Sequence, residues 1–168
     1  MYACRVRAPR PAQGRTLGVD YGQKRIGLAL SDATGMLARA WKTIERSGNP
    51  AQVASALADV AHALLHEDDG LVAIVVGLPR RLNGDPNDMT PIVEAVVERL
   101  RALVALPVVL QDERLTSLEA DSRLARHEKD WRKRKGMLDA MAAAVILQDY
   151  LDATDADRTA AGTEGDDT

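Results

Sequence analysis

Two patterns of apolar and polar positions divide the chain. In its first third, short apolar runs are separated by glycine-containing turns, which is typical of β-strands that follow one another closely. A later run, residues 71–77, is continuously apolar and rich in β-branched side chains, which predicts a strand buried on both faces of a sheet. Apolar residues at helical spacing lie between and after these runs. The predicted strands are 16–20, 25–31, 38–44, 71–77 and 108–112, and the predicted helices are 50–67, 91–104, 117–128 and 137–151.

The order of these elements predicts an α/β fold. The first three strands have short connections, so we expect them to form an antiparallel meander. Helices separate the remaining strands from each other and from the meander, so two parallel strands can be added to it. The result is a mixed five-stranded sheet with helices on both faces. A chain of 168 residues that is 46% apolar suffices for one such domain, which we place at residues 16–152.

The two ends of the chain differ in charge. Residues 1–15 contain four arginines together with proline and glycine, and they predict a flexible basic segment. From Asp152 onward there are six acidic residues and a single arginine, Arg158. Such a composition cannot bury an apolar core, so residues 153–168 are predicted to be a disordered acidic tail.

Composition also excludes several classes of protein. A single cysteine, Cys4, rules out an internal disulfide and a multi-cysteine zinc site. With 3% aromatic residues and no Phe, the chain offers no aromatic platform for single-stranded nucleic acid. No apolar run approaches the roughly 18 residues of a membrane helix, and the first residues do not resemble a signal peptide. We therefore expect a cytoplasmic protein with no membrane partner.

Acidic residues lie where the predicted strands end. Chemistry in such sheets gathers at the carboxyl ends of the strands. Asp20 closes the first strand, Asp112 and Glu113 close the fifth, and Asp139 is expected in the first turn of the last helix. Carboxylates brought together here would repel one another without a cation. Their oxygens suit Mg²⁺ or Mn²⁺, and two such ions can drive phosphodiester hydrolysis.

Each of these acids also has a simpler explanation. Asp20 would merely begin a turn, although the Lys24 and Arg25 that follow it suit a phosphate site. Asp139 would complement the dipole of its helix. Neighbouring strand positions face opposite sides, so only one of Asp112 and Glu113 can point into the cluster. The pair His62 and His66 has helical spacing but no third ligand, which favours a solvated helix face.

A basic run precedes the last predicted helix. Residues 123–135 contain seven Lys and Arg residues and two acids. This surplus suits contact with a phosphate backbone, and the alternative is a solvated loop. The residues that we expect to contact nucleic acid are Lys24, Arg25, Arg114, Arg132, Lys133, Arg134 and Lys135.

Four segments resemble the successive motifs of the YqgF/RuvX family, which are RNase H-like nucleases related to RuvC-type Holliday junction resolvases. They are LGVDYGQKRIGLALSD, IVVGLPRRLNGD, VVLQDERLTSLEA and RKRKGMLDAMAAAVILQDYLD. The resemblance spans residues 16–152 and implies an RNase H-like fold with an acidic, divalent-metal site. It places the family's acids on Asp20, Glu113 and Asp139, with Asp112 as the fallback ligand.

The resemblance implies one of two reactions, 5′-end maturation of precursor 16S ribosomal RNA or resolution of a Holliday junction. We predict a metal-dependent nuclease that processes precursor rRNA, as a monomer or a homodimer, with junction cleavage as the alternative. A non-catalytic nucleic-acid binder is a rival, but it gains nothing from acids that repel phosphate. An ATP-binding fold of the actin and sugar-kinase type needs a second phosphate-binding hairpin, which the sequence lacks.

Overall fold

The sheet has the predicted mixed architecture. The computed structural model describes residues 14–113 and 131–162. Its five strands lie in the order β3-β2-β1-β4-β5, with β1, β2 and β3 antiparallel and with β4 parallel to both β1 and β5. This arrangement confirms the meander with two added parallel strands. The strands are β1 (Arg15–Tyr21), β2 (Arg25–Ser31), β3 (Ala38–Glu45), β4 (Leu71–Leu78) and β5 (Val108–Asp112).

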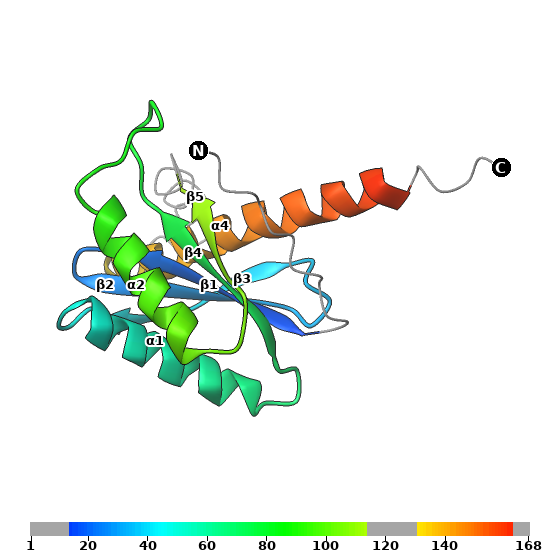
Figure 1. The fold of residues 1–168 in the computed structure, drawn as a ribbon, viewed down its shortest axis with the longest axis horizontal. Coiled ribbons are helices and arrows are strands. Elements are labelled where there is room, and N and C mark those ends of the chain that lie inside the picture. The colour runs from blue at the N-terminus through cyan, green and yellow to red at the C-terminus, as the bar shows by residue number, and fades with distance from the viewer. Residues whose placement is uncertain (1–13, 114–130, 163–168) are drawn as a thin grey trace.

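Helices cover both faces of this sheet, as expected for an RNase H-like fold. The helices α1 (Pro50–Leu65) and α2 (Thr90–Leu103) pack on one face, and α4 (Trp131–Gly162) crosses the other (Figure 1). The predicted helix 117–128 lies outside the described residues. No helix in the described part of the chain is both long enough and apolar enough to cross a membrane.

Two apolar clusters follow the alternation of the strands. Leu17 and Val19 of β1 point into the larger cluster, which the sheet forms with α1 and α2. Ala29 and Val75 point the other way, into a smaller cluster with α4. The α4 side of that cluster includes two alanines, so the helix can approach the sheet closely. Every second strand residue near the end of β1 therefore faces α4.

The helix α4 begins earlier and ends later than the predicted 137–151. The basic residues 132–135 are therefore helical, and Asp139 lies in the third turn, not the first, so it does not complement the helix start. Residues 153–162 are helical too, in place of the predicted disorder. Across α4 as a whole, alanine, lysine and arginine are strong helix formers and no proline interrupts the chain. Helix propensity therefore outweighs the tendency of charged residues toward disorder.

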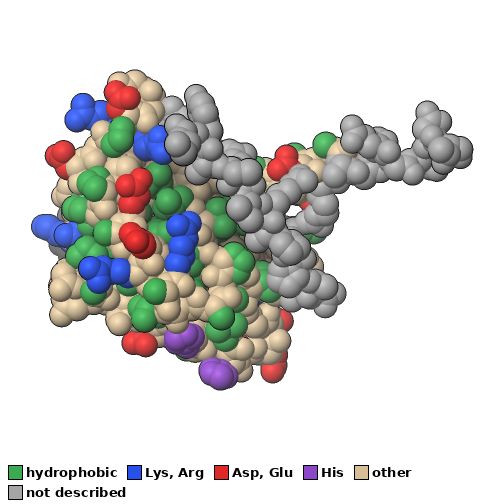
Figure 2. Space-filling model, viewed as in Figure 1, with side chains coloured by type: hydrophobic (Ala, Val, Ile, Leu, Met, Phe, Trp, Pro, Cys, Tyr) green, Lys and Arg blue, Asp and Glu red, His purple; other side chains and the backbone are tan. Residues whose placement is uncertain are grey.

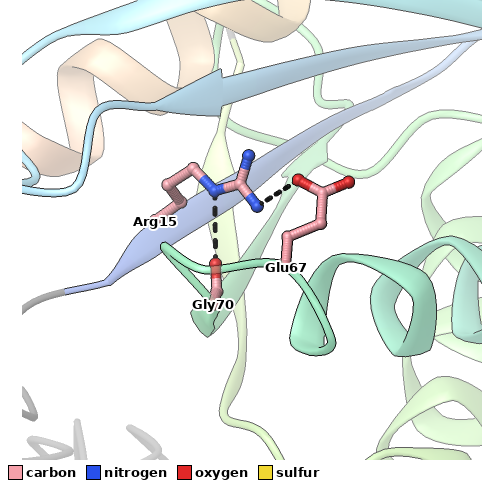
Figure 3. Close-up of polar contacts among 3 residues, drawn as sticks. All are labelled: Arg15, Glu67 and Gly70. Atoms are coloured by element: carbon pink, nitrogen blue, oxygen red, sulfur yellow. Dashed lines mark hydrogen bonds and ion pairs between the residues drawn. The ribbon is translucent and has the colours of Figure 1, made fainter.

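The first strand also reaches into the segment predicted to be flexible. Arg15 opens β1, and its side chain is mostly buried. Figure 3 shows its Nη2 donating to Glu67 Oε2 at 2.7 Å and its Nε donating to the Gly70 carbonyl at 3.3 Å. This arginine therefore ties the start of β1 to the loop after α1 and does not belong to a loose basic arm.

Candidate active site

Asp20 lies on the α4 face of the sheet, one residue before the end of β1. Its neighbours Val19 and Tyr21 point into the opposite core, so strand alternation directs Asp20 toward α4. The residue is half-buried. The carboxyl group thus lies at the edge where the parallel strands β1, β4 and β5 all end, as the sequence predicts.

Glu113 reaches Asp20 by crossing the strand that separates them. It follows β5 directly, and β4 lies between β5 and β1. A Cβ atom on Gly77 of β4 would lie 2.5 Å from Glu113 Oε2, so the carboxyl group lies directly over the glycine and would have to shift if a side chain stood there. The Glu113 side chain hydrogen-bonds to Asp20. Asp112 is exposed and faces the other side of the sheet, as the alternation of β5 requires.

These two carboxyl groups share one negative charge at neutral pH. Burial, together with the nearby carboxylate of Asp139, raises the pKa of Asp20 to about 6, although the hydrogen bond from Glu113 opposes this shift. Burial and the charge of Asp20 raise the pKa of Glu113 to about 9. Glu113 therefore keeps its proton and donates it in the hydrogen bond to the Asp20 carboxylate.

Close packing of α4 brings Asp139 to the same place. Gly27 of β2 pairs with Asp20 in the sheet. A Cβ atom on Gly27 would collide with the backbone carbonyl of Asp139, so the glycine lets the helix pass directly above this pair. A similar close approach occurs at Gly18, where a Cβ would lie 2.8 Å from Leu147 Cβ. The depth at which α4 lies is therefore fixed by the glycines beneath it.

The carboxylate of Asp139 is held by Arg25. The Arg25 Nε atom lies 3.0 Å from Asp139 Oδ2, with the side chains 40% and 26% exposed respectively. Asp139 is nevertheless close enough to raise the pKa of Asp20 by its charge. The structure thus brings the three predicted acids to one edge of the sheet, with two in contact and the third paired with an arginine.

The donor set suits a divalent cation. Carboxylate oxygens are the ligands that Mg²⁺ and Mn²⁺ prefer, and a cation would stabilise the ionised forms that burial disfavours in Asp20 and Glu113. In residues 14–113 and 131–162, however, no three His, Cys, Asp or Glu side chains are arranged to hold one ion. The exposed His62 of α1 and His66 at its C-cap also belong to no such group among the described residues.

Part of the predicted nucleic-acid surface can be located. Lys24 is exposed in the turn between β1 and β2, and Arg25 begins β2, so both lie at the turn end of the β1–β2 hairpin, to which Asp20 also belongs. The face formed by α1 and α2 has acidic and basic side chains interspersed (Figure 2), which gives its described residues no strongly basic patch. Arg114 lies outside the described residues, as do the side chains of Arg132, Lys133, Arg134 and Lys135.

Sequence reasoning missed two features of this site. Gly27 received no role, and Arg25 was expected to contact phosphate, not a carboxylate. A glycine inside a strand often marks a close approach of another backbone, so the sequence did contain a signal for Gly27. The ion pair had none, because it depends on where α4 crosses β2.

The comparisons with known proteins cover the same part of the chain. The sequence model of RuvX, described as a Holliday junction resolvase, matches residues 14–153. A protein of Anaeromyxobacter dehalogenans (strain 2CP-C), named "Putative pre-16S rRNA nuclease", is 44% identical over 138 residues, which are 82% of this chain and 96% of that protein. A protein of Syntrophus aciditrophicus with the same name is 40% identical over 139 residues, 83% and 89% of the two chains. Among solved structures, Thermus thermophilus RuvC in complex with a Holliday junction substrate aligns over 79% of this chain and 91% of its own, at 15% identity and a TM-score of 0.48.

Proposed function

This chain belongs to the RuvX family, and from that membership we propose that it is a divalent-metal-dependent nuclease that acts in the cytoplasm on the 5′ end of precursor 16S ribosomal RNA. The relatives that support this substrate carry it in their names and align over nearly their whole length. The proposed reaction is hydrolysis of a phosphodiester bond.

The contact between Asp20 and Glu113 carries the proposal. Asp20 of β1 and Glu113, which follows β5, meet across Gly77 of the strand between them. Burial disfavours the ionised forms of both carboxyl groups and so raises both pKa values. In a protein that only binds nucleic acid, such a cluster would lower the affinity, since its negative charge repels phosphate. Perturbed carboxyl groups gathered at the carboxyl edge of a sheet are typical of a catalytic site.

Asp20, Glu113 and Asp139 would hold one or two Mg²⁺ or Mn²⁺ ions. When bound, these ions supply an activated water molecule and stabilise the leaving oxygen. The other contributions come from the protein's own side chains. The Glu113 carboxyl would lose its proton to solvent before serving as a ligand, and the Lys24 ammonium at the exposed edge would bind a phosphate of the substrate backbone.

Junction resolution is the second candidate, supported by the description of the family model. A four-way junction has two-fold symmetry, so paired incisions call for a C2 dimer, whereas trimming an RNA end needs only a monomer. Light scattering of the protein, free and with a junction, separates the two. A species that is monomeric in both conditions would rule out the resolvase.

The direct test presents two labelled substrates to the purified protein with Mn²⁺ or Mg²⁺. One is precursor 16S rRNA that retains its 5′ extension, and the other is a synthetic four-way junction. We expect cleavage of the RNA at its 5′ end and at least an approximately 100-fold loss in Asp20→Asn, because a shared ligand is removed. Asp59→Asn is the matched control, since that exposed carboxylate lies on α1, which packs on the opposite face of the sheet. Equal cleavage by Asp20→Asn and the parent would refute the role of Asp20.

A further inference from the structure

Arg25 forms an ion pair with the Asp139 carboxylate, which a metal site made of three acids would need as a ligand. Arg25 and Gly27 lie on the same face of β2, two residues and thus about 7 Å apart. The backbone of Asp139 lies over Gly27, which is paired with Asp20. The Asp139 carboxylate therefore has two neighbours at the site, the Arg25 guanidinium that it contacts and the Asp20 carboxylate that it repels.

Two properties make this pair easy to exchange. Both side chains are partly exposed, at 40% and 26%, and ion pairs in contact with water contribute little net free energy. The backbone of Asp139 packs directly against Gly27, the cross-strand partner of Asp20, and the charge of Asp139 already acts on the Asp20 carboxyl group.

We propose that Arg25 is a displaceable counter-ion of Asp139. In the protein without a cation it neutralises the third acid and weakens the repulsion between the carboxylates of Asp139 and Asp20. When a divalent cation binds, Asp139 exchanges the guanidinium for the cation. Arg25 is thus a positioning residue that competes with the metal and lowers its affinity. This inference rests on the proposed metal-dependent function and adds the residue that sets the metal requirement.

The competition predicts tighter metal binding when Arg25 is removed. Calorimetric titration of the full chain with MnCl₂, without nucleic acid, measures the affinity directly. We expect Arg25→Gln to bind Mn²⁺ about two- to five-fold more tightly than the parent, the range that corresponds to loss of a partly exposed ion pair.

A double-mutant cycle separates competition from simple charge repulsion. In an Asp139→Asn background the arginine has no carboxylate to hold, so Arg25→Gln should leave the weakened Mn²⁺ affinity unchanged. Equal tightening in both backgrounds would mean that Arg25 acts only by through-space repulsion, which overturns the proposal. Weaker binding by Arg25→Gln in the parent background would also overturn it, because Arg25 would then prepare Asp139 for the metal.

Arg15→Gln provides a matched control. It removes one positive charge and one ion pair, that of Arg15 with Glu67 (Figure 3), at the opposite end of β1. Its Mn²⁺ affinity should equal that of the parent. A parent protein that does not bind Mn²⁺ would refute the metal dependence itself, and with it this inference. A parent that binds, with an unchanged Arg25→Gln variant, would refute only the role of Arg25.

Discussion

Replacing Glu113 by Gln should stabilise the protein in the absence of metal, and increasingly so as the pH rises. Burial raises the pKa of Glu113 from 4.5 to about 9. Between these two values the unfolded chain has released the proton that the folded chain still holds. Folding must therefore take up a proton, and the stability of the parent falls as the pH rises above about 4.5. The glutamine amide can still donate to Asp20 but has no proton to lose.

The expected magnitude follows from proton linkage. At pH 6 the solution is about 1.5 pH units above the ordinary pKa of Glu113, and each pH unit corresponds to about 1.36 kcal/mol. The variant should then be about 2 kcal/mol more stable than the parent. This figure requires only that the folded-state pKa lies above 6. For a chain of this size it corresponds to a rise in Tm of about 4–8 °C.

Thermal unfolding in the presence of EDTA, at pH 4 and at pH 6, measures this difference. The two proteins should have similar Tm values at pH 4, where both states keep the proton, and should separate at pH 6. Glu98→Gln removes the same charge from the exposed face of α2 and should show no such separation. If parent and Glu113→Gln lose stability in parallel between the two pH values, the carboxyl group does not hold its proton as described.

Two further predictions concern α4. Gly27→Ala should lower stability by about 1–3 kcal/mol in urea unfolding and reduce cleavage, because its Cβ meets the backbone of Asp139 and must push the helix outward. An unchanged unfolding midpoint would show that α4 does not rest on β2. Replacing Arg132, Lys133, Arg134 and Lys135 by Ala should flatten the slope of log affinity against log salt by roughly 2, while cleavage persists at saturating substrate. An unchanged slope would show that these residues do not meet phosphate.

The strands were predictable because their signals are local. Each apolar run ends at a turn, and every predicted strand lies within two residues of the observed ends. Strand alternation predicted that only one of Asp112 and Glu113 faces α4, and the resemblance to the YqgF/RuvX motifs selected Glu113. The contact that Glu113 makes with Asp20 across β4 could not be predicted from the sequence. It depends on the order of strands in the sheet and on the absence of a side chain at Gly77.

The ends of α4 were misjudged because charge was given more weight than helix propensity. Residues 153–162 contain two acids, Asp155 and Asp157, and were assigned to the acidic tail, but their alanines favour a helix that continues from a well-packed segment. Thr154 shows how this extension is accommodated, since its hydroxyl donates to the Leu151 carbonyl at 2.8 Å within the helix. Propagation of an existing helix costs much less than nucleation of a new one.

The early start of α4 changes what the basic run can do. Four consecutive basic residues in a loop could all turn toward one phosphate backbone. In a helix, successive positions are separated by about 100°, so a single strand of nucleic acid meets about two of the four. This is why we expect the salt slope to change by roughly 2 and not by 3–4. Because the same helix bears Asp139 about one to two turns further on, phosphate contacts at its start would place the substrate backbone in a defined position relative to the acids.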